Sequence, residues 1–263
     1  MTSILSVRDL EKTFGPLVAA HNITLDFPPE QTVGIIGANG AGKTTFINMV
    51  TGHLIPSKGS IRFEDHDITG RPSREITRLG ISRSFQVAQL FPSLTAYENI
   101  CAAVAIARGP DRLIARVLAP LGSPDTRQEA DAALDLFQIA AYRNAPAMTL
   151  PQGVRKLLDI AMAVAGRPRV LLLDEPTSGV SIQEKFAVMD VVMSALRSRK
   201  ITVLFVEHDM EIVGRFADRV LAFYDGTVIA DGPPAQALAD PKVQAFISGT
   251  KDRIGGSSAS RSD

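Results

Sequence analysis

Cysteine, tryptophan, net charge and long apolar runs are what this sequence has least of. Cys101 is the single cysteine in 263 residues, so a disulfide framework is excluded and a reducing compartment fits. We expect Cys101 to be a small side chain packed in a helix. The 28 basic and 28 acidic side chains cancel, and this balance gives no support for a general nucleic-acid-binding surface.

No apolar run approaches the roughly 20 residues that a membrane-spanning helix needs. The longest runs, such as residues 170–173 and 203–206, have the length of strands. The first ten residues alternate as a short strand does and do not resemble a signal peptide. We therefore expect a soluble, cytoplasmic chain that meets a membrane only through a partner. The end of the chain is rich in glycine and serine, and we expect residues 251–263 to form a disordered tail.

Two kinds of apolar pattern predict two kinds of sheet. Residues 4–7, 23–27 and 60–63 alternate apolar and polar side chains, which indicates a small antiparallel sheet near the N-terminus. Continuous apolar runs at 33–36, 170–173 and 203–206, with helical patterns between them, indicate buried parallel strands in a three-layer α/β core. Asp225 and Gly226 separate two later apolar runs and predict a hairpin turn.

The strand patterns disappear between residues 87 and 166. Ala130, Leu134 and Phe137 recur there at helical spacing, and several prolines punctuate the stretch. We therefore predict one domain over residues 1–250. Its α/β core comprises residues 1–86 and 167–250, and residues 87–166 form an inserted helical subdomain.

The segment 37–45 says most about function, since it fits the phosphate-binding loop pattern G-x-x-x-x-G-K-S/T between a predicted strand and a predicted helix. Its glycines let successive backbone N–H groups point at one phosphate chain, and the helix N-terminus adds positive partial charge. A chance glycine-rich turn would not explain the flanking strand and helix. The candidate nucleotide-binding residues are Gly37, Ala38, Asn39, Gly40, Ala41, Gly42, Lys43, Thr44 and Thr45.

Two acidic residues end the apolar run 170–173. A buried strand that delivers Asp174 at its carboxyl end would place a carboxylate beside Mg²⁺. Glu175 would then face the attacking water and polarise it. Alone, such a pair is equally typical of a strand-to-loop boundary, but the phosphate loop earlier in the chain makes the functional interpretation the stronger one.

His208 follows another core strand on the edge of the sheet where a ligand is expected. A lone histidine is usually structural, but this position favours a contact with the γ-phosphate. Gln86 ends the first α/β half just before the helical stretch. A single glutamine carries almost no signal by itself.

With these residues in this order, the chain resembles the ATP-binding subunits of ABC transporters from residue 10 to about residue 249. By resemblance, residues 37–45 are the Walker A loop, residues 170–175 are the Walker B strand, and the cofactors are ATP and Mg²⁺. The catalytic residues that the resemblance implies are Lys43, Glu175 and His208. The metal ligands that it implies are Thr44, Gln86 and Asp174, with Gln86 also contacting the nucleotide.

Phe14 stands where this family places an aromatic ring that stacks on adenine. Packing in the core is the alternative for this side chain.

Residues 79–86, 90–95, 207–210 and 240–243 resemble one branch of the family more closely. That branch serves importers of branched-chain amino acids and of related small polar solutes such as urea and amides, and the match is to the larger of their two ATPase subunits. The resemblance implies a second ATPase subunit, with a heterodimer favoured and a homodimer left open. It also implies two transmembrane permease subunits, a periplasmic binding protein acting indirectly, no nucleic acid, and a peripheral position on the cytoplasmic face of the inner membrane.

The chain departs from the family at its signature sequence, Leu-Ser-Gly-Gly-Gln, because residues 150–154 read Leu-Pro-Gln-Gly-Val. In the family this element reaches across a dimer to the γ-phosphate of the other subunit, which assigns Pro151 and Gly153 to the partner's nucleotide. Pro151 offers neither a hydroxyl nor an N–H, whereas Gly153 keeps its N–H. Ser181 likewise replaces an aspartate after the Walker B strand. A tolerated variant and a weakened second ATP site both remain open.

The sequence therefore predicts the ATP-hydrolysing subunit of an importer. A regulatory cassette with weak hydrolysis is permitted by the altered signature but opposed by Glu175 and His208. A soluble cassette acting on nucleic acid or ribosomes is opposed by the single cassette and the zero net charge. An unrelated phosphate-loop kinase would not need Gln86, Glu175 and His208 in this order.

Overall fold

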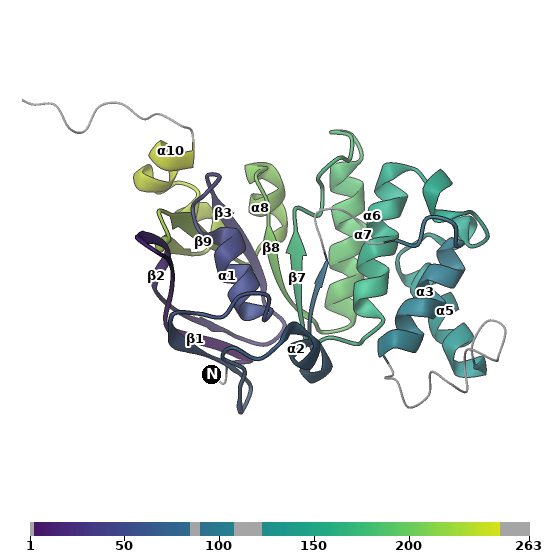
Figure 1. Cartoon of the computed structure of the whole chain (residues 1–263). Helices are drawn as coiled ribbons and strands as arrows, with labels where there is room; N and C mark the ends of the chain where they lie inside the picture. Colours follow the sequence, from purple (N-terminus) through teal and green to yellow (C-terminus); the bar gives the residue numbers. More distant parts are fainter. Residues whose placement is uncertain (1–2, 85–89, 108–122, 248–263) are drawn as a thin grey trace, which may run out of the picture.

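The computed structural model describes residues 3–84, 90–107 and 123–247, which form two sheets with helices packed around them (Figure 1). Gln86 and the segment 251–263 lie outside these ranges.

The smaller sheet is antiparallel and lies near the N-terminus, as the alternating segments predicted. Its strand order is β2-β1-β4-β5, with β1 at Leu5–Phe14, β2 at Leu17–Phe27, β4 at Lys58–Phe63 and β5 at His66–Asp67. Strands β1 and β2 run further than the alternation indicated. Their pairing continues to Phe14 and Leu17, at the tip of the hairpin where side chains are exposed and alternation carries no signal.

The larger sheet has the order β10-β9-β3-β8-β7-β6 and is parallel except for β10. Its strands are β3 at Thr32–Gly37, β6 at Ile81–Ser84, β7 at Val170–Asp174, β8 at Thr202–Val206, β9 at Arg219–Tyr224 and β10 at Thr227–Gly232. The three predicted buried strands are therefore neighbours. The predicted hairpin turn is also confirmed, because Asp225 and Gly226 join β9 to β10 with φ values of 46° and 75°.

Helices cover both faces of the larger sheet, which confirms the three-layer core. They are α1 at Lys43–Val50, α2 at Ser73–Leu79, α3 at Ala96–Ala107, α5 at Pro124–Leu136, α6 at Gln152–Val164, α7 at Lys185–Ser198, α8 at Met210–Phe216, α9 at Pro234–Ala237 and α10 at Pro241–Ile247. Between α5 and α6 lie two short 3-10 helices, at Ala140–Tyr142 and Ala147–Thr149. Helices α3 and α5 lie at the end of the molecule away from the smaller sheet (Figure 1).

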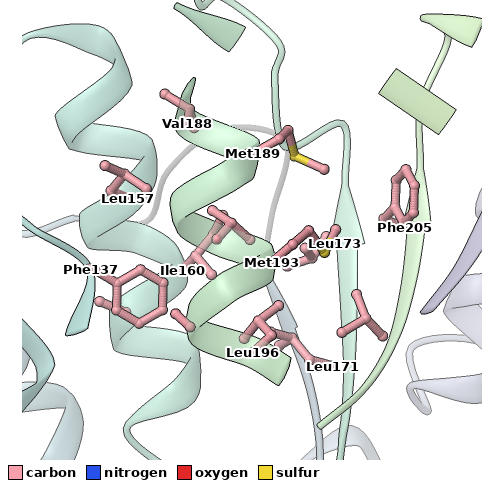
Figure 2. Close-up of a cluster of buried hydrophobic side chains, with 14 of the residues drawn as sticks. Phe137, Leu157, Ile160, Leu171, Leu173, Val188, Met189, Met193, Leu196 and Phe205 are labelled. Atoms are coloured by element: carbon pink, nitrogen blue, oxygen red, sulfur yellow. The ribbon is translucent and has the colours of Figure 1, made fainter. Parts of the chain in front are cut away.

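Alternate side chains of β7 enter two separate cores. Leu171 and Leu173 belong to a core shared with α6 and α7, and Figure 2 shows Met193 of α7 beside them. The intervening residues of β7 pack instead toward α1 and the smaller sheet. Because the strand is buried on both faces, the position of its carboxyl end is fixed.

Cys101 lies buried in α3, as its composition-based interpretation predicted. Burial raises the pKa of its thiol, so it is an inert core side chain.

Candidate nucleotide-binding and hydrolysis site

Three neighbouring strands of the larger sheet, β3, β8 and β7, lead at their carboxyl ends into the phosphate loop, His208 and the acid pair. Ile35 of β3 and Asp174 of β7 both pair with Val206, the last residue of β8. The phosphate loop follows β3, and His208 follows β8. The order of the strands thus brings together, at one edge of the sheet, segments that are far apart in the sequence.

The phosphate loop is a backbone cradle that depends on glycine. Gly37 has a φ of 149° and Gly42 a φ of 100°. A Cβ atom at Gly37 would lie 2.4 Å from the carbonyl oxygen of Phe223, and one at Gly42 would lie 2.7 Å from that of Ala19. No other residue type fits these two positions without moving β9 or β2.

The N-terminus of α1 is open to an anion. Its N-cap, Gly42, provides no side-chain hydrogen bond, and the first turn of the helix contains no acidic residue. The first N–H groups of a helix have no intrahelical acceptor, and the helix dipole adds positive charge there. Thr44, in this first turn, is exposed, and so are Ala38, Asn39 and Gly40 of the loop.

Lys43 lies within the loop with only 6% of its surface exposed. Its Nζ atom donates hydrogen bonds to the carbonyl oxygens of Gly37 at 2.7 Å and Ala38 at 2.9 Å. Burial lowers the pKa of Lys43, and the negative charges of Glu175 and Asp174 oppose that shift. The lysine of the loop and the two acids at the carboxyl end of β7 therefore share one electrostatic environment.

Asp174, at the end of β7, is paired with an arginine that the sequence analysis did not single out. The Nη2 atom of Arg83 donates to Oδ2 of Asp174 at 2.6 Å, and its Nη1 atom donates to Oδ1 of Asn48 at 2.6 Å. The two charged side chains are only 10% and 13% exposed. A basic residue in the short strand β6 was the only sequence signal, and it gained meaning only once β6 was found beside β7.

Glu175 and His208 are in direct contact. The Oε1 atom of Glu175 lies 3.0 Å from Nε2 of His208. Glu175 also has a φ of 48°, which is uncommon for a residue with a side chain, and its N–H donates to the carbonyl of Val206 at 3.0 Å. That backbone hydrogen bond holds the residue at the end of β8, beside the histidine.

Glu207 is a second residue that the sequence analysis missed. It is 4% exposed, and its Oε1 atom accepts hydrogen bonds from the N–H of Thr177 at 2.9 Å and from its hydroxyl at 2.6 Å. Its Oε2 atom accepts from the N–H of His208 at 3.2 Å. The buried carboxylate thus ties the loop after β7 to the start of the histidine segment.

Phe14 lies at the tip of the β1–β2 hairpin, with 49% of its surface exposed, so the ring is not packed in the core. The Nζ atom of Lys12 lies 5.1 Å from the centre of its ring. Strand β2 passes directly beside the phosphate loop at Ala19. Phe14 ends β1 and pairs with Leu17 of β2, so its exposed ring lies on the strand next to the one that passes the loop.

The Pro151 segment starts α6. Pro151 is the N-cap and gives no side-chain hydrogen bond, while Gly153 is buried in the first turn of the helix, with Val188 3.2 Å from where its Cβ would lie. In Figure 1, α6 and α1 lie on opposite sides of β7 and β8. The signature segment of this chain is therefore remote from the phosphate loop of the same chain, and Gln86 lies outside the described residues.

Comparison with known proteins identifies the family. Residues 20–178 match the family model described as ABC transporter. The chain belongs to this family, and it is an ATP-binding cassette ATPase.

The curated relatives include high-affinity branched-chain amino acid transport ATP-binding proteins. The chain is 34% identical over 243 residues to BraF of Pseudomonas aeruginosa, with 91% of this chain and 95% of BraF covered. It is 32% identical over 247 residues to LivG of Escherichia coli K12, with 91% of this chain and 95% of LivG covered.

Solved structures of cassettes agree with the fold. The ADP conformation of MJ1267, an ATP-binding cassette of an ABC transporter, superposes with a TM-score of 0.83 at 28% identity, covering 95% of this chain and 100% of that one. A nucleotide-free cassette from an ABC transporter gives a TM-score of 0.80 at 28% identity, covering 97% and 100%.

Across residues 3–84, 90–107 and 123–247, no helix has both the length and the apolar character to span a bilayer. As an ABC transporter ATPase, the chain is an ATP-binding subunit of a transporter complex.

Proposed function

We propose that this subunit hydrolyses Mg²⁺-ATP at the carboxyl edge of its larger sheet and thereby drives uptake of branched-chain amino acids or related small polar solutes. The observation that carries the proposal is the convergence of the phosphate loop, Asp174, Glu175 and His208 at that edge. The names of BraF and LivG, which state branched-chain amino acid transport, support this class of solute.

In this proposal the phosphate loop, from Gly37 to Thr45, binds the phosphates through its backbone N–H groups. Lys43 would exchange its two loop carbonyls for the β- and γ-phosphates, a favourable change because a buried ammonium gains far more from phosphate than from neutral acceptors. Phe14 would stack on the adenine from the exposed tip of its hairpin.

The residues at the edge also suit a magnesium ion. The Thr44 hydroxyl and the Asp174 carboxylate are oxygen ligands, which Mg²⁺ prefers, and Gln86 is a third candidate. Within the described residues no group of three or more His, Cys, Asp or Glu side chains could hold a metal ion by itself. That fits Mg²⁺, which takes few protein ligands and completes its shell with substrate phosphates and water. When bound, the ion would neutralise charge that develops on the phosphates.

Hydrolysis would use the contact between Glu175 and His208. In the structure the two side chains contact each other, with Oε1 of Glu175 3.0 Å from Nε2 of His208. When a γ-phosphate is present, Nε2 of His208 would donate to a phosphate oxygen, which frees Glu175 to accept a proton from the attacking water. Transfer of His208 from the carboxylate to the phosphate would thus couple recognition of ATP to activation of the base.

The second half of each ATP site would come from another cassette. We place Pro151 and Gly153 against the nucleotide of the partner subunit, where the N–H of Gly153 and the dipole of α6 remain available. Pro151 offers no side-chain hydrogen bond, and Ser181 hydrogen-bonds Glu184 of its own chain at 2.7 Å. These two departures are the basis of the proposal that the second site is weakened, and a tolerated variant is the alternative.

The proposed assembly contains a second ATPase subunit, two transmembrane permease subunits and, indirectly, a periplasmic binding protein, at the cytoplasmic face of the inner membrane. Within the chain we propose one domain over residues 1–250, with a core of 1–86 and 167–250 and a helical subdomain of 87–166. That subdomain would pass motion to the permeases. Residues 251–263 are proposed as a tail without a role in the site.

Transport by the purified complex, reconstituted in vesicles, tests this function. We expect uptake of labelled leucine, isoleucine or valine, or of urea or a small amide, that requires ATP inside the ATPase-facing compartment. Complexes that contain Glu175→Gln should bind the solute but not accumulate it. Equal accumulation by the variant and the unmodified complex, or movement of solute without ATP, would overturn the proposal.

A further inference from the structure

The Arg83 guanidinium is paired with the carboxylate of Asp174, the proposed metal ligand. It is 2.6 Å from Oδ2 of Asp174, and both side chains are nearly buried. Its other terminal nitrogen binds Asn48, a residue of the helix that begins at the phosphate loop. The arginine thus joins the acid of β7 to α1 across the floor of the site.

Arg83 also connects this floor to a second surface. Together with Ser82, Asp159, Phe91 and Ile106 it lines a groove of about 380 Å³ between β6, α3 and α6. One side chain therefore touches the nucleotide edge at one end and faces an open groove beside the helical region. A movement of the guanidinium would alter both places.

A guanidinium and a magnesium ion repel each other at this distance. Metal–oxygen bonds to Mg²⁺ are about 2.1 Å long, so an ion on Asp174 would lie within about 5 Å of an arginine that kept its present position. Arginine cannot relieve the repulsion by losing its proton, because it remains charged in proteins. The site is mostly buried, so water screens the two charges less than it would at the surface.

We propose that Arg83 is a resident counter-cation of the metal site, which Mg²⁺ must displace from Asp174 before the ion can bind there. This inference rests on the proposed role of Asp174 as a metal ligand. ATP carries several negative charges and compensates the added positive charge, so metal enters together with nucleotide. After hydrolysis, return of Arg83 to Asp174 favours release of the metal with the products. Arg83 is in this sense a positioning residue that sets when the site is loaded.

The test is a titration of the full-length protein with Mn²⁺ in the absence of nucleotide, followed by the loss of the free-ion signal in electron paramagnetic resonance. Arg83→Gln removes the charge, and we expect the affinity for Mn²⁺ to rise at least about tenfold. Arg83→Lys keeps the charge and should remain close to the unmodified protein. Affinity for ATP measured in a chelator should change little for either variant.

Arg215→Gln is the matched control, since Arg215 forms an exposed ion pair with Asp190 of α7. It removes the same charge and should leave Mn²⁺ affinity unchanged. An unchanged or lower Mn²⁺ affinity in Arg83→Gln, once folding is verified by circular dichroism, overturns the counter-cation role.

Two further variants separate the possible failures. Asp174→Asn should weaken Mn²⁺ binding, and if it does not, the proposed metal site itself is wrong. If it does while Arg83→Gln fails to strengthen binding, only the inference about Arg83 is wrong. Should Arg83→Gln not fold, Asn48→Ala removes the second anchor of the guanidinium and should raise Mn²⁺ affinity a few-fold, whereas no rise would count against displacement.

Discussion

The carboxylate of Glu175 and the imidazole of His208 meet at 3.0 Å, although 33 residues separate them in the chain. The contact exists because β7 and β8 are adjacent parallel strands whose carboxyl ends are in register. Glu175 also has a left-handed backbone conformation, which aims its side chain back across that edge. In this arrangement the proposed base and the proposed phosphate sensor satisfy each other until a substrate separates them.

Replacement of Glu175 by glutamine should leave ATP binding intact and slow hydrolysis by about 10²–10⁴-fold, because the amide keeps the size of the side chain but cannot accept the water's proton. Phosphate release and equilibrium binding of ATP measure the two effects separately. Glu75→Gln, on the exposed face of α2, is the control for loss of one negative charge. Turnover near that of the unmodified protein would remove Glu175 from the mechanism.

Replacement of Lys43 by methionine tests the proposed inequality of the two ATP sites. In the proposed assembly, Lys43 would serve the site that the partner's signature completes, whereas the matching lysine of the partner would serve the site that Pro151 completes. We expect the change in this chain to abolish most of the ATPase activity of the complex, and the change in the partner to remove a minor share. Equal losses in the two complexes would favour a tolerated variation of the signature.

Thr177→Val should lower the free energy of unfolding by about 1–3 kcal/mol, since it leaves one hydrogen bond of the buried Glu207 carboxylate unmade. Urea denaturation followed by circular dichroism measures the change. Glu207→Gln and the double variant complete a cycle, and the two effects should not add because the residues share one network. Additive effects would show that the residues act independently.

Because Lys156 is buried in α6, we expect the free energy of unfolding to depend on pH. Burial lowers the pKa of Lys156 below its ordinary value of 10.5, and the charges of Asp159, Glu207, Asp174 and Glu175 oppose the shift. Between the folded-state pKa and 10.5 the unfolded chain binds more protons, so stability rises with pH across that window. Lys156→Met removes this component.

The Lys156→Met variant should therefore be the more stable protein at neutral pH, and its advantage should shrink as the pH approaches 10.5. Urea unfolding curves for both proteins at a series of pH values give the difference directly. An advantage that stays constant with pH, or grows, would contradict the assignment to Lys156.

Phe14→Ala should weaken ATP binding by about 1–3 kcal/mol without lowering stability, because stacking on a base is lost while the ring contributes little to the core. Fluorescent-nucleotide displacement measures affinity, and thermal unfolding measures stability. Ile106→Ala, another exposed apolar side chain, on α3, is the comparison. Loss of stability with unchanged affinity for ATP would show that Phe14 packs in the fold and does not stack on the base.

Local sequence patterns predicted most of the fold, because a strand that is buried on both faces of a sheet appears in the sequence as a continuous apolar run. The runs that became β3, β7 and β8 are wholly apolar, and Ala130, Leu134 and Phe137 mark the buried side of the α5 segment. Strand β6 has no such apolar run, since two serines and an arginine make up most of its four residues. It is a strand because β7 pairs with it.

The candidate site likewise contains a part that the sequence predicted and a part that it did not. The phosphate loop and the acid pair are contiguous in sequence, so their chemistry was visible there. Arg83 and Glu207 act through partners brought close by strand order, and no spacing in the sequence announces such a pairing. The contact between Glu175 and His208 was likewise beyond prediction, although each residue had been singled out.

Gly42 lies where three segments of backbone crowd together, since a Cβ on it would come within 2.7 Å of the Ala19 oxygen and 3.1 Å of the Gly226 Cα atom. Main-chain atoms, which have no rotamers, therefore set the separation between the phosphate loop and β2, the strand that pairs with Phe14 of β1. With Phe14 stacked on the base as proposed, this crowding would set the distance between the base and the phosphate loop. The pocket would then discriminate between nucleotides by the distance from the base to the terminal phosphate. An analogue with a shorter or longer phosphate chain could keep the contact at the ring or the contact at the phosphate loop, but not both.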